Sequence, residues 1–288
     1  MDLVLYLPTI CPKEYLVNNR SQTDLLLFWT KRWNEASLSD KVLIIKDHMI
    51  SVDFIQKSEP TVSKPLLIAA MQDMGDVGSI VIDFINSNLN TSIFREVQPS
   101  YPAYVIDNGG YIDVPEEKWN YRYAKDIIVF GGGSGQPSST EELNVLCQDV
   151  INVAKKYSTR FIYTLGGFHT QKPIDGEPKT FVTTTSKDLT EQVRKLGILT
   201  TPEASIITGF NGLILGFAKM NGIQGIGLYA ELNEPKLPQY RSAKSILKTL
   251  EKMTYRKFGN TSDLDSMAKD VESRSRGKRF DPDQSYSA

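Results

Sequence analysis

Short apolar runs that end near glycine alternate with amphipathic runs along most of this sequence. LLIAAM at 66–71, DIIVF at 126–130 and RFIYTLGG at 160–167 are continuous apolar segments, the pattern of strands buried on both faces of a parallel sheet. Runs with apolar residues at helical spacing follow the first two, at 77–85 and 143–154. Strands that alternate with helices predict an α/β fold, with a mainly parallel central sheet and helices on both of its faces.

The same alternation continues in the second half of the chain. DLTEQVRKL at 188–196 is typical of a short helix, and GIGLYAEL at 225–232 of another buried strand. GLILGFAKMNG at 212–222 is apolar nearly all round, which predicts a buried helix. We expect the last amphipathic helix at 240–258.

A β-rich stretch at 91–123 interrupts this alternation. It holds the strand-like pieces SIFREV, AYVIDN, GYIDVP and WNYRYA, and we interpret it as an insertion or an antiparallel extension of the same sheet. Asn108-Gly109-Gly110 between two of these pieces is a hairpin signal. The stretch is crowded with aromatic residues, which suit a protein interface and equally suit a cover over the core. These are Tyr101, Tyr104, Tyr111, Trp119, Tyr121 and Tyr123.

Three regions of different character divide the chain. Residues 1–48 form an irregular N-terminal extension with one apolar cluster, LLLFW at 25–29. Because Met49 opens MISVDFIQ, an alternative interpretation is that translation starts there, after an upstream extension with little selected structure. Residues 49–258 form the α/β domain. Residues 259–288 form a polar C-terminal tail that we expect to be partly helical and then disordered.

Charge and composition exclude several classes of function. The formal net charge of −1 gives no general attraction to nucleic acid or to an anionic membrane. The longest apolar runs fall far short of the ~20 residues of a membrane helix, and the start of the sequence lacks the basic region of a signal peptide. Cys11 and Cys147 make neither a disulfide framework nor a zinc cluster. A location in the reducing cytoplasm is the simplest interpretation.

The stretch FGGGSGQPSSTEEL lies where nucleotide-binding folds hold phosphate. A P-loop needs GxxxxGK and then Ser or Thr, and this loop has no lysine. A dinucleotide loop needs GxGxxG, and its sixth position is Gln136 when counted from Gly131, or Ser138 when counted from Gly133. We therefore favour a sharp turn before a helix, capped by Ser138 or Ser139, over a weak anion site at the helix N-terminus.

Two further glycine turns follow predicted strands. The turn at 73–78 carries carboxylates at Asp73 and Asp76, which repel phosphate and suit the start of a helix. Two aspartates alone make a poor site for a divalent ion, so we expect no metal. The glycines that shape the turns at the strand ends are Gly75, Gly78, Gly131, Gly133, Gly135, Gly166 and Gly167.

Catalytic groups are scarce in this sequence. Its two histidines are His48, in the extension, and His169, which follows a predicted strand; Glu231 ends the last predicted strand. No HExxH, CxxC, GxSxG or Ser-His-Asp pattern can be assembled from the residues present. We therefore predict neither a catalytic residue nor a bound cofactor.

Four motifs that occur in order resemble the proteasome assembly chaperone family, in its archaeal branch. They are GDVGSIVIDF, GGGSGQPSST, RFIYTLGGF and ITGFNGLILGFAKMNGIQGIGLYAE, and the resemblance covers residues 49–258. It implies a three-layer α/β sandwich similar to phosphorylase/hydrolase-like domains, without established enzymatic activity. It also implies a homo-oligomer that binds proteasome α-subunits.

Several members of that family dock between α-subunits through a C-terminal tripeptide made of a hydrophobic residue, a tyrosine and any residue. This sequence ends in QSYSA, so Tyr286 is third from the end and Ser285 is not hydrophobic. The tail therefore departs from the family's docking mode. Tyr286 stays a candidate partner-binding residue, beside the alternative that its position is incidental.

Three functions are open on this sequence. The first is a chaperone-like protein that binds proteasome α-subunits without catalysis. The alternative is an enzyme acting on a nucleoside or nucleotide, in a cleft where the glycine turns at 73–78, 131–137 and 166–170 converge. The third is a structural oligomer whose aromatic insertion forms the interface.

Overall fold

The computed structural model describes residues 52–99, 105–132, 135–137 and 139–278. The chain divides into two compact units, Met1–Val52 and Asp53–Ala288, and the described residues belong almost entirely to the second. The predictions for the N-terminal extension, His48, Tyr101, Tyr104, Gly133, Ser138 and Tyr286 lie outside the described residues.

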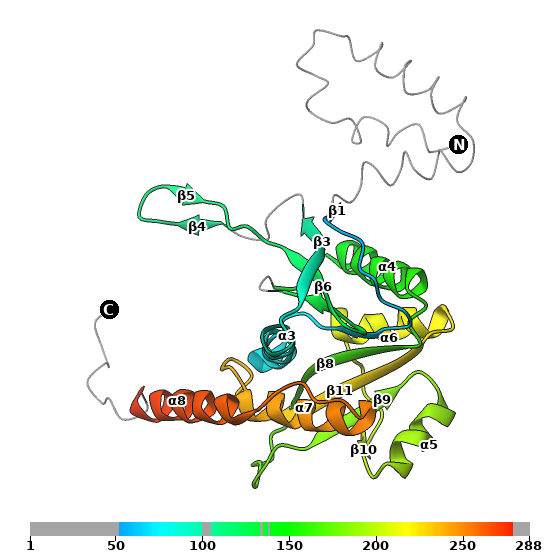
Figure 1. The fold of residues 1–288 in the computed structure, drawn as a ribbon. Coiled ribbons are helices and arrows are strands. Elements are labelled where there is room, and N and C mark those ends of the chain that lie inside the picture. Colours follow the sequence, from blue (N-terminus) through cyan, green and yellow to red (C-terminus); the bar gives the residue numbers. More distant parts are fainter. Residues whose placement is uncertain (1–51, 100–104, 133–134, 138, 279–288) are drawn as a thin grey trace, which may run out of the picture. The chain divides into compact units, whose positions relative to one another are not determined.

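A mixed sheet of nine strands forms the centre of the described chain (Figure 1), in the order β1-β3-β6-β7-β2-β8-β11-β9-β10. The strands are β1 (Val52–Gln56), β2 (Leu66–Ala69), β3 (Ser92–Pro99), β6 (Trp119–Ala124), β7 (Ile127–Gly131), β8 (Phe161–His169), β9 (Thr180–Thr184), β10 (Leu199–Thr200) and β11 (Gln224–Leu232). The central strands β7, β2, β8 and β11 are parallel, and antiparallel pairs flank them on both sides. The predicted α/β fold with a mainly parallel central sheet is confirmed.

Helices cover both faces of this sheet, which makes three layers (Figure 1). One layer contains α3 (Val77–Asn88), α7 (Tyr240–Thr254) and α8 (Ser262–Lys278), and the other contains α4 (Thr140–Lys156) and α6 (Phe210–Met220). A short 3-10 helix, η3 (Met74–Asp76), precedes α3, and α5 (Lys187–Lys195) packs beside β9 and β10. The chain thus buries the sheet on both sides, as the apolar runs of its central strands require.

Alternate residues of the strands supply the two cores. Leu66 and Ile68 of β2 belong to the same buried cluster as Val81 of α3. On the other face, the ring of Phe130 lies 4.4 Å from that of Tyr121 and 5.5 Å from that of Phe210, at the start of α6 (centroid distances). Both faces of the centre are therefore dry and closely packed.

The β-rich stretch proves to be two structures. β3 and β6 pair antiparallel and extend the central sheet beyond β7. β4 (Ile106–Asp107) and β5 (Ile112–Asp113) form a separate two-stranded hairpin. Its turn is held by the Asp107 carboxylate, which accepts hydrogen bonds from the backbone N–H groups of Gly109 and Gly110. The hairpin predicted from Asn108-Gly109-Gly110 is confirmed.

Two helices differ from their predicted form. α6 is buried on one side only: Met220 is 85% exposed and Gly216 is exposed, so the prediction of a buried helix at 212–222 is wrong. The sheet and α4 cover only one side of this helix, so apolar residues on its other side remain half-buried or exposed. α7 ends at Thr254, before the predicted end at Phe258, because Tyr255 adopts a left-handed conformation with φ of 55°.

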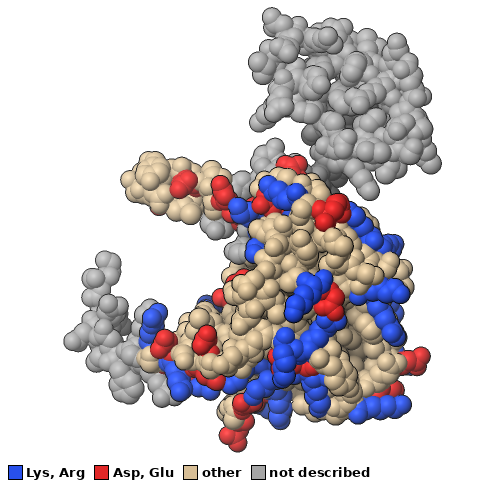
Figure 2. Space-filling model, viewed as in Figure 1, with Lys and Arg blue, Asp and Glu red and all other residues tan. Residues whose placement is uncertain are grey.

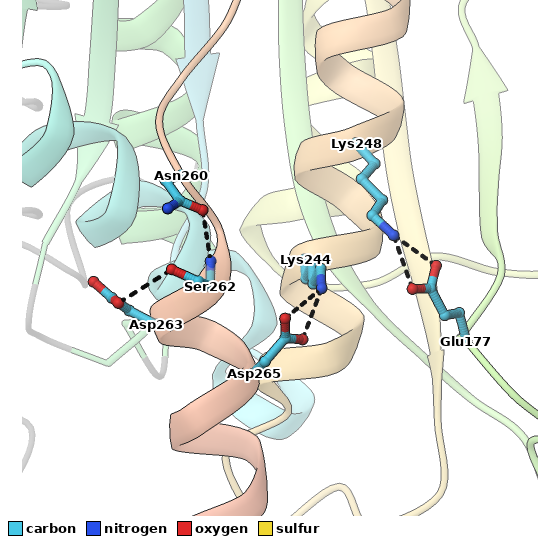
Figure 3. Close-up of polar contacts among 7 residues, drawn as sticks. All are labelled: Glu177, Lys244, Lys248, Asn260, Ser262, Asp263 and Asp265. Carbon is cyan, nitrogen blue, oxygen red and sulfur yellow. Dashed lines mark hydrogen bonds and ion pairs between the residues drawn. The ribbon is translucent and has the colours of Figure 1, made fainter.

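The C-terminal helix α8 packs on α7. Leu264 and Ala268 are buried, and the Lys244 ammonium of α7 contacts both carboxylate oxygens of Asp265, at 2.6 and 2.7 Å (Figure 3). The Asn260 side chain accepts a hydrogen bond from the backbone N–H of Ser262 at the start of α8. The first part of the polar tail is therefore a helix attached to the domain by apolar and ionic contacts.

Candidate functional site

The loops at the carboxyl ends of β2, β7 and β8 lie close together, because parallel neighbouring strands end at the same edge of a sheet. The turn at 73–78 follows β2, the glycine loop follows β7, and the Gly166-Gly167 pair lies near the end of β8. We predicted a turn at 166–170, whereas β8 runs on to His169 with both glycines paired to β11. This edge is the candidate site.

Asp73 connects two of these segments. Its Oδ1 accepts a hydrogen bond of 3.0 Å from the backbone N–H of Gly78, in the first turn of α3, and its Oδ2 accepts one from the backbone N–H of Gly167 in β8. Burial raises the pKa of the Asp73 carboxyl from 3.8 to about 7, against the opposing effect of these two donors. The interpretation of Asp73 as a helix-start residue agrees with this geometry.

The glycines at this edge stand where the chain has no room for a side chain. A Cβ atom on Gly75 would lie 2.5 Å from Cγ of Gln239, and one on Gly131 would lie 2.5 Å from the carbonyl oxygen of Ala70. At Gly167 the added atom would lie 2.5 Å from Leu232 Cδ2 and 2.7 Å from the Met74 carbonyl oxygen. These glycines allow strands, loops and helices to approach one another.

Two amide side chains tie the glycine loop and α6 to the segment that follows β2. Gln136 donates to the carbonyl of Gln72 at 2.7 Å and accepts from the backbone N–H of Phe210 at 2.8 Å. Asn211 bonds to both the N–H and the carbonyl of Met71, at 3.0 and 3.1 Å. The Phe210 N–H is one of the free donors that a helix N-terminus offers to an anion, and here it is already used.

Sequence reasoning missed the roles of Gln136, Asn211 and Tyr229. The Tyr229 hydroxyl donates to the carbonyl oxygen of Asn211 at 3.0 Å, which extends the network into β11. Asn211 is buried near the start of α6, whose first nine residues are otherwise apolar or glycine, and that polar position is the signal in the sequence that could have indicated it.

The glycine loop also starts α4 as predicted. The Ser139 hydroxyl accepts a hydrogen bond from the backbone N–H of Glu142 at 3.1 Å, so Ser139 is the N-cap of α4. The carbonyl oxygen of Gly135 accepts a hydrogen bond from the indole N–H of Trp119 at 3.1 Å. These contacts hold the described part of the loop against the insertion.

The remaining candidate groups do not converge on this edge as a catalytic set. His169 is exposed at the end of β8, and the Glu231 carboxylate accepts a hydrogen bond from the backbone N–H of Lys179 at 2.9 Å. Among the described residues, no group of three or more His, Cys, Asp or Glu side chains is placed to hold a metal ion. Nor does any described helix have the length and apolar character needed to cross a membrane.

The described aromatic residues of the insertion take different places. Trp119 and Tyr121 are buried, with 2% and 0% of their surfaces exposed, whereas Tyr111 on the hairpin is 64% exposed. The Tyr121 hydroxyl donates to the Asp149 carboxylate at 2.7 Å, and the Arg95 guanidinium pairs with the same carboxylate at 2.6 Å. β6 thus covers the core, and the exposed aromatic surface belongs to the hairpin.

The protein is therefore a three-layer α/β protein in which hydrogen bonds from side chains connect the loops at the strand ends. The chain belongs to the PAC2 family, whose model matches residues 67–276. An uncharacterized protein of Methanocaldococcus jannaschii is 30% identical over 210 residues, which cover 72% of this chain and 80% of the relative.

Solved structures with the same fold come from the archaeon Pyrococcus furiosus. PbaB, described as an archaeal proteasome activator, has a TM-score of 0.69 at 22% identity, covering 80% of this chain and 100% of PbaB. PbaA, described as an archaeal homolog of proteasome-assembly chaperone, has a TM-score of 0.66 at 20% identity, covering 79% of this chain and 91% of PbaA. The family resemblance inferred from the sequence motifs is confirmed.

Proposed function

We propose that this protein is a chaperone-like factor of the archaeal proteasome, which binds proteasome α-subunits in the cytoplasm as a homo-oligomer and catalyses no reaction. The observation that carries this proposal is that polar side chains at the strand-end edge are already hydrogen-bonded within the chain. There the carboxylate of Asp73 and the amides of Gln136 and Asn211 bond to the chain's own backbone. A ligand at this edge would have to displace these bonds, and at Asn211 that would leave a buried polar group unpaired.

The relatives support the same proposal. The descriptions of PbaA and PbaB as an assembly-chaperone homolog and a proteasome activator indicate a proteasome partner for this fold. Binding without catalysis also agrees with the scarcity of reactive groups at the edge, where His169 is exposed and Glu231 holds a backbone N–H.

A capture experiment with recombinant archaeal proteasome subunits tests the proposal. The immobilised full-length chain should retain α-subunits at micromolar concentration and leave separately supplied β-subunits in the flow-through. A Tyr286→Ala variant shows whether the C-terminal tail contributes to the binding of α-subunits. If the wild type and the variant retain equal amounts, the contact belongs to the folded domain. If neither chain retains α-subunits, the proposal is wrong.

The alternative enzyme is tested by thermal shift with nucleosides, nucleotides and inorganic phosphate. A ligand that binds the folded state raises the Tm by mass action. We expect no shift, because the backbone N–H groups of Gly167 and Phe210 at the strand-end edge already have partners in the chain. A concentration-dependent rise in Tm with one of these compounds, abolished by Gln136→Ala, would favour the enzyme instead.

A further inference from the structure

The hairpin arm, which we define as residues 105–114, carries five exposed large apolar side chains. Figure 1 shows it extending away from the central sheet. Its large apolar side chains are exposed by 41% to 64%. They are Val105, Ile106, Tyr111, Ile112 and Val114. Exposed apolar side chains gathered on one projecting element indicate an interaction site.

Both faces of the arm contribute to this surface. Ile106 pairs with Asp113 and Asp107 pairs with Ile112, so successive pairs place one isoleucine on each face of the ribbon. The arm therefore cannot bury its apolar residues by folding one face onto its own sheet. A lone two-stranded hairpin is only marginally stable in water, so a second surface that receives the arm would stabilise it.

The arm and its base are acidic. Residues 105–118 contain Asp107, Asp113, Glu116 and Glu117 against the single base Lys118. In Figure 2 the projecting arm shows uncharged and acidic surface toward its tip. This charge disfavours nucleic acid and anionic lipid as partners and favours an apolar surface edged with lysine.

The same chain offers such a surface on the outer side of α6. Leu213, Phe217 and Met220 follow one another at helical spacing and are half-buried or exposed. Ile206, just before the helix, is 91% exposed. A Cβ atom on Gly216, in the same stripe, would meet nothing within 4 Å.

Basic side chains edge this α6 face at its C-terminal end. Lys219 lies on the helix and is exposed. Lys155 of α4 reaches the same end, where its ammonium donates to the Asn221 side chain at 2.7 Å. The α6 face thus has the two properties that the arm requires, exposed apolar residues and positive charge.

We propose that the hairpin arm of one molecule docks on the α6 face of a second copy. This inference rests on the homo-oligomer that forms part of the proposed function. Because the two surfaces differ, the contact is heterologous, and repetition with a closing rotation produces a ring. The apolar residues on the Ile112 face of the arm bury against Leu213, Phe217 and Met220, and acidic side chains of the arm face Lys155 and Lys219.

Light scattering and sedimentation measure the association of four chains. Ile112→Asp alters the arm and Met220→Asp alters the α6 face, and each should raise the dissociation constant about a hundredfold, a size typical of an interface hot spot. Tyr255→Asp is the matched control: Tyr255 is 84% exposed, close to the 85% of Met220, and its left-handed φ of 55° tolerates aspartate. This control should associate as the unaltered chain does.

Mixing the two defective chains gives the decisive result. The chain with Met220→Asp keeps its arm and the chain with Ile112→Asp keeps its α6 face, so together they should form a two-chain complex with the affinity of a single unaltered contact. A wild-type chain that is monomeric, an Ile112→Asp chain that still assembles, or a mixture that stays dissociated would each overturn the proposal. Capture of α-subunits by the same variants separates this result from the proposed function, since that capture tests a different contact.

Discussion

Asp73 is the residue that most directly joins local sequence to the architecture of the strand-end edge. One carboxylate accepts N–H groups from the first turn of α3 and from β8, so it fixes a helix relative to a strand far away in the sequence. Burial makes its ionised form costly and raises its pKa to about 7. The contact that Asp73 makes between α3 and β8 therefore depends on the protonation of its carboxyl group.

This pKa predicts a specific dependence of stability on pH. Because the folded pKa of about 7 exceeds the ordinary aspartate value of 3.8, the folded state binds the proton more tightly, and Asp73 stabilises the fold most below pH 3.8. Its contribution declines as pH rises and is lost above the folded pKa, a change of about 4 kcal/mol at most. Urea unfolding of the wild type and of Asp73→Asn at several pH values measures it. A variant with the same pH slope as the wild type would contradict the assignment.

Close packing at Gly167 predicts a large effect for a small substitution. In Gly167→Ala the new methyl group would meet Leu232 and the Met74 carbonyl at 2.5 and 2.7 Å, and we expect a loss of about 1 to 3 kcal/mol in the free energy of unfolding. Gly216→Ala is the matched control, since its methyl group meets nothing within 4 Å, and it should gain about 0.5 to 1 kcal/mol. Chemical denaturation measures both, and equal effects would refute the packing argument.

At the residue scale the sequence indicated where turn residues lie better than it indicated which groups hydrogen-bond to one another. The glycine-rich turns and Asp73 could be located because glycine and aspartate have narrow backbone roles. Gln136 and Asn211 could not, because what they bond to depends on how β2 and α6 approach one another. That approach is a property of the folded layers and leaves no local pattern.

At the scale of elements, α8 is the part whose attachment can be tested most simply. Leu264 is 4% exposed against the domain, whereas the neighbouring Lys244–Asp265 pair is partly exposed. Leu264→Ala should destabilise the docked helix by about 2 to 4 kcal/mol. Asp265→Asn should have a smaller effect, because solvent screens an exposed ion pair. Hydrogen exchange of the α8 amides measures both. Greater loss of protection in Asp265→Asn would show that the ion pair dominates.

The long and strongly patterned elements were the predictable ones. β2, β7, β8 and β11 could be recognised because strands buried on both faces leave continuous apolar runs. β9, with the sequence TFVTT, and the two-residue β10 carry no such run. β9 forms because β11 offers it an edge, and β10 in turn pairs with β9. For α6 the apolar composition was read correctly, but which side would be covered depends on neighbours that the sequence does not specify.

At the scale of the whole molecule, the described sheet, helices and cores belong to the unit Asp53–Ala288. We therefore expect a chain that starts at Met49 to keep its fold, with a Tm within about 2 °C of that of the full chain. Calorimetry of the two chains measures this difference, with circular dichroism as the check on secondary structure. A large drop in Tm would show that the first 48 residues contribute to the stability of the domain.

The hairpin arm is inserted between two strands that pair with each other without it. Val97 of β3 lies opposite Trp119 of β6, and Trp119 is buried. The register between β3 and β6 is therefore fixed by residues outside the hairpin arm. The segment between these strands can therefore change in length or in the sequence of its tip while the pairing of β3 with β6 is kept. A binding loop from another protein, grafted between β3 and β6, would be supported by these two paired strands. Changes in this one segment are therefore enough to give related chains different binding partners.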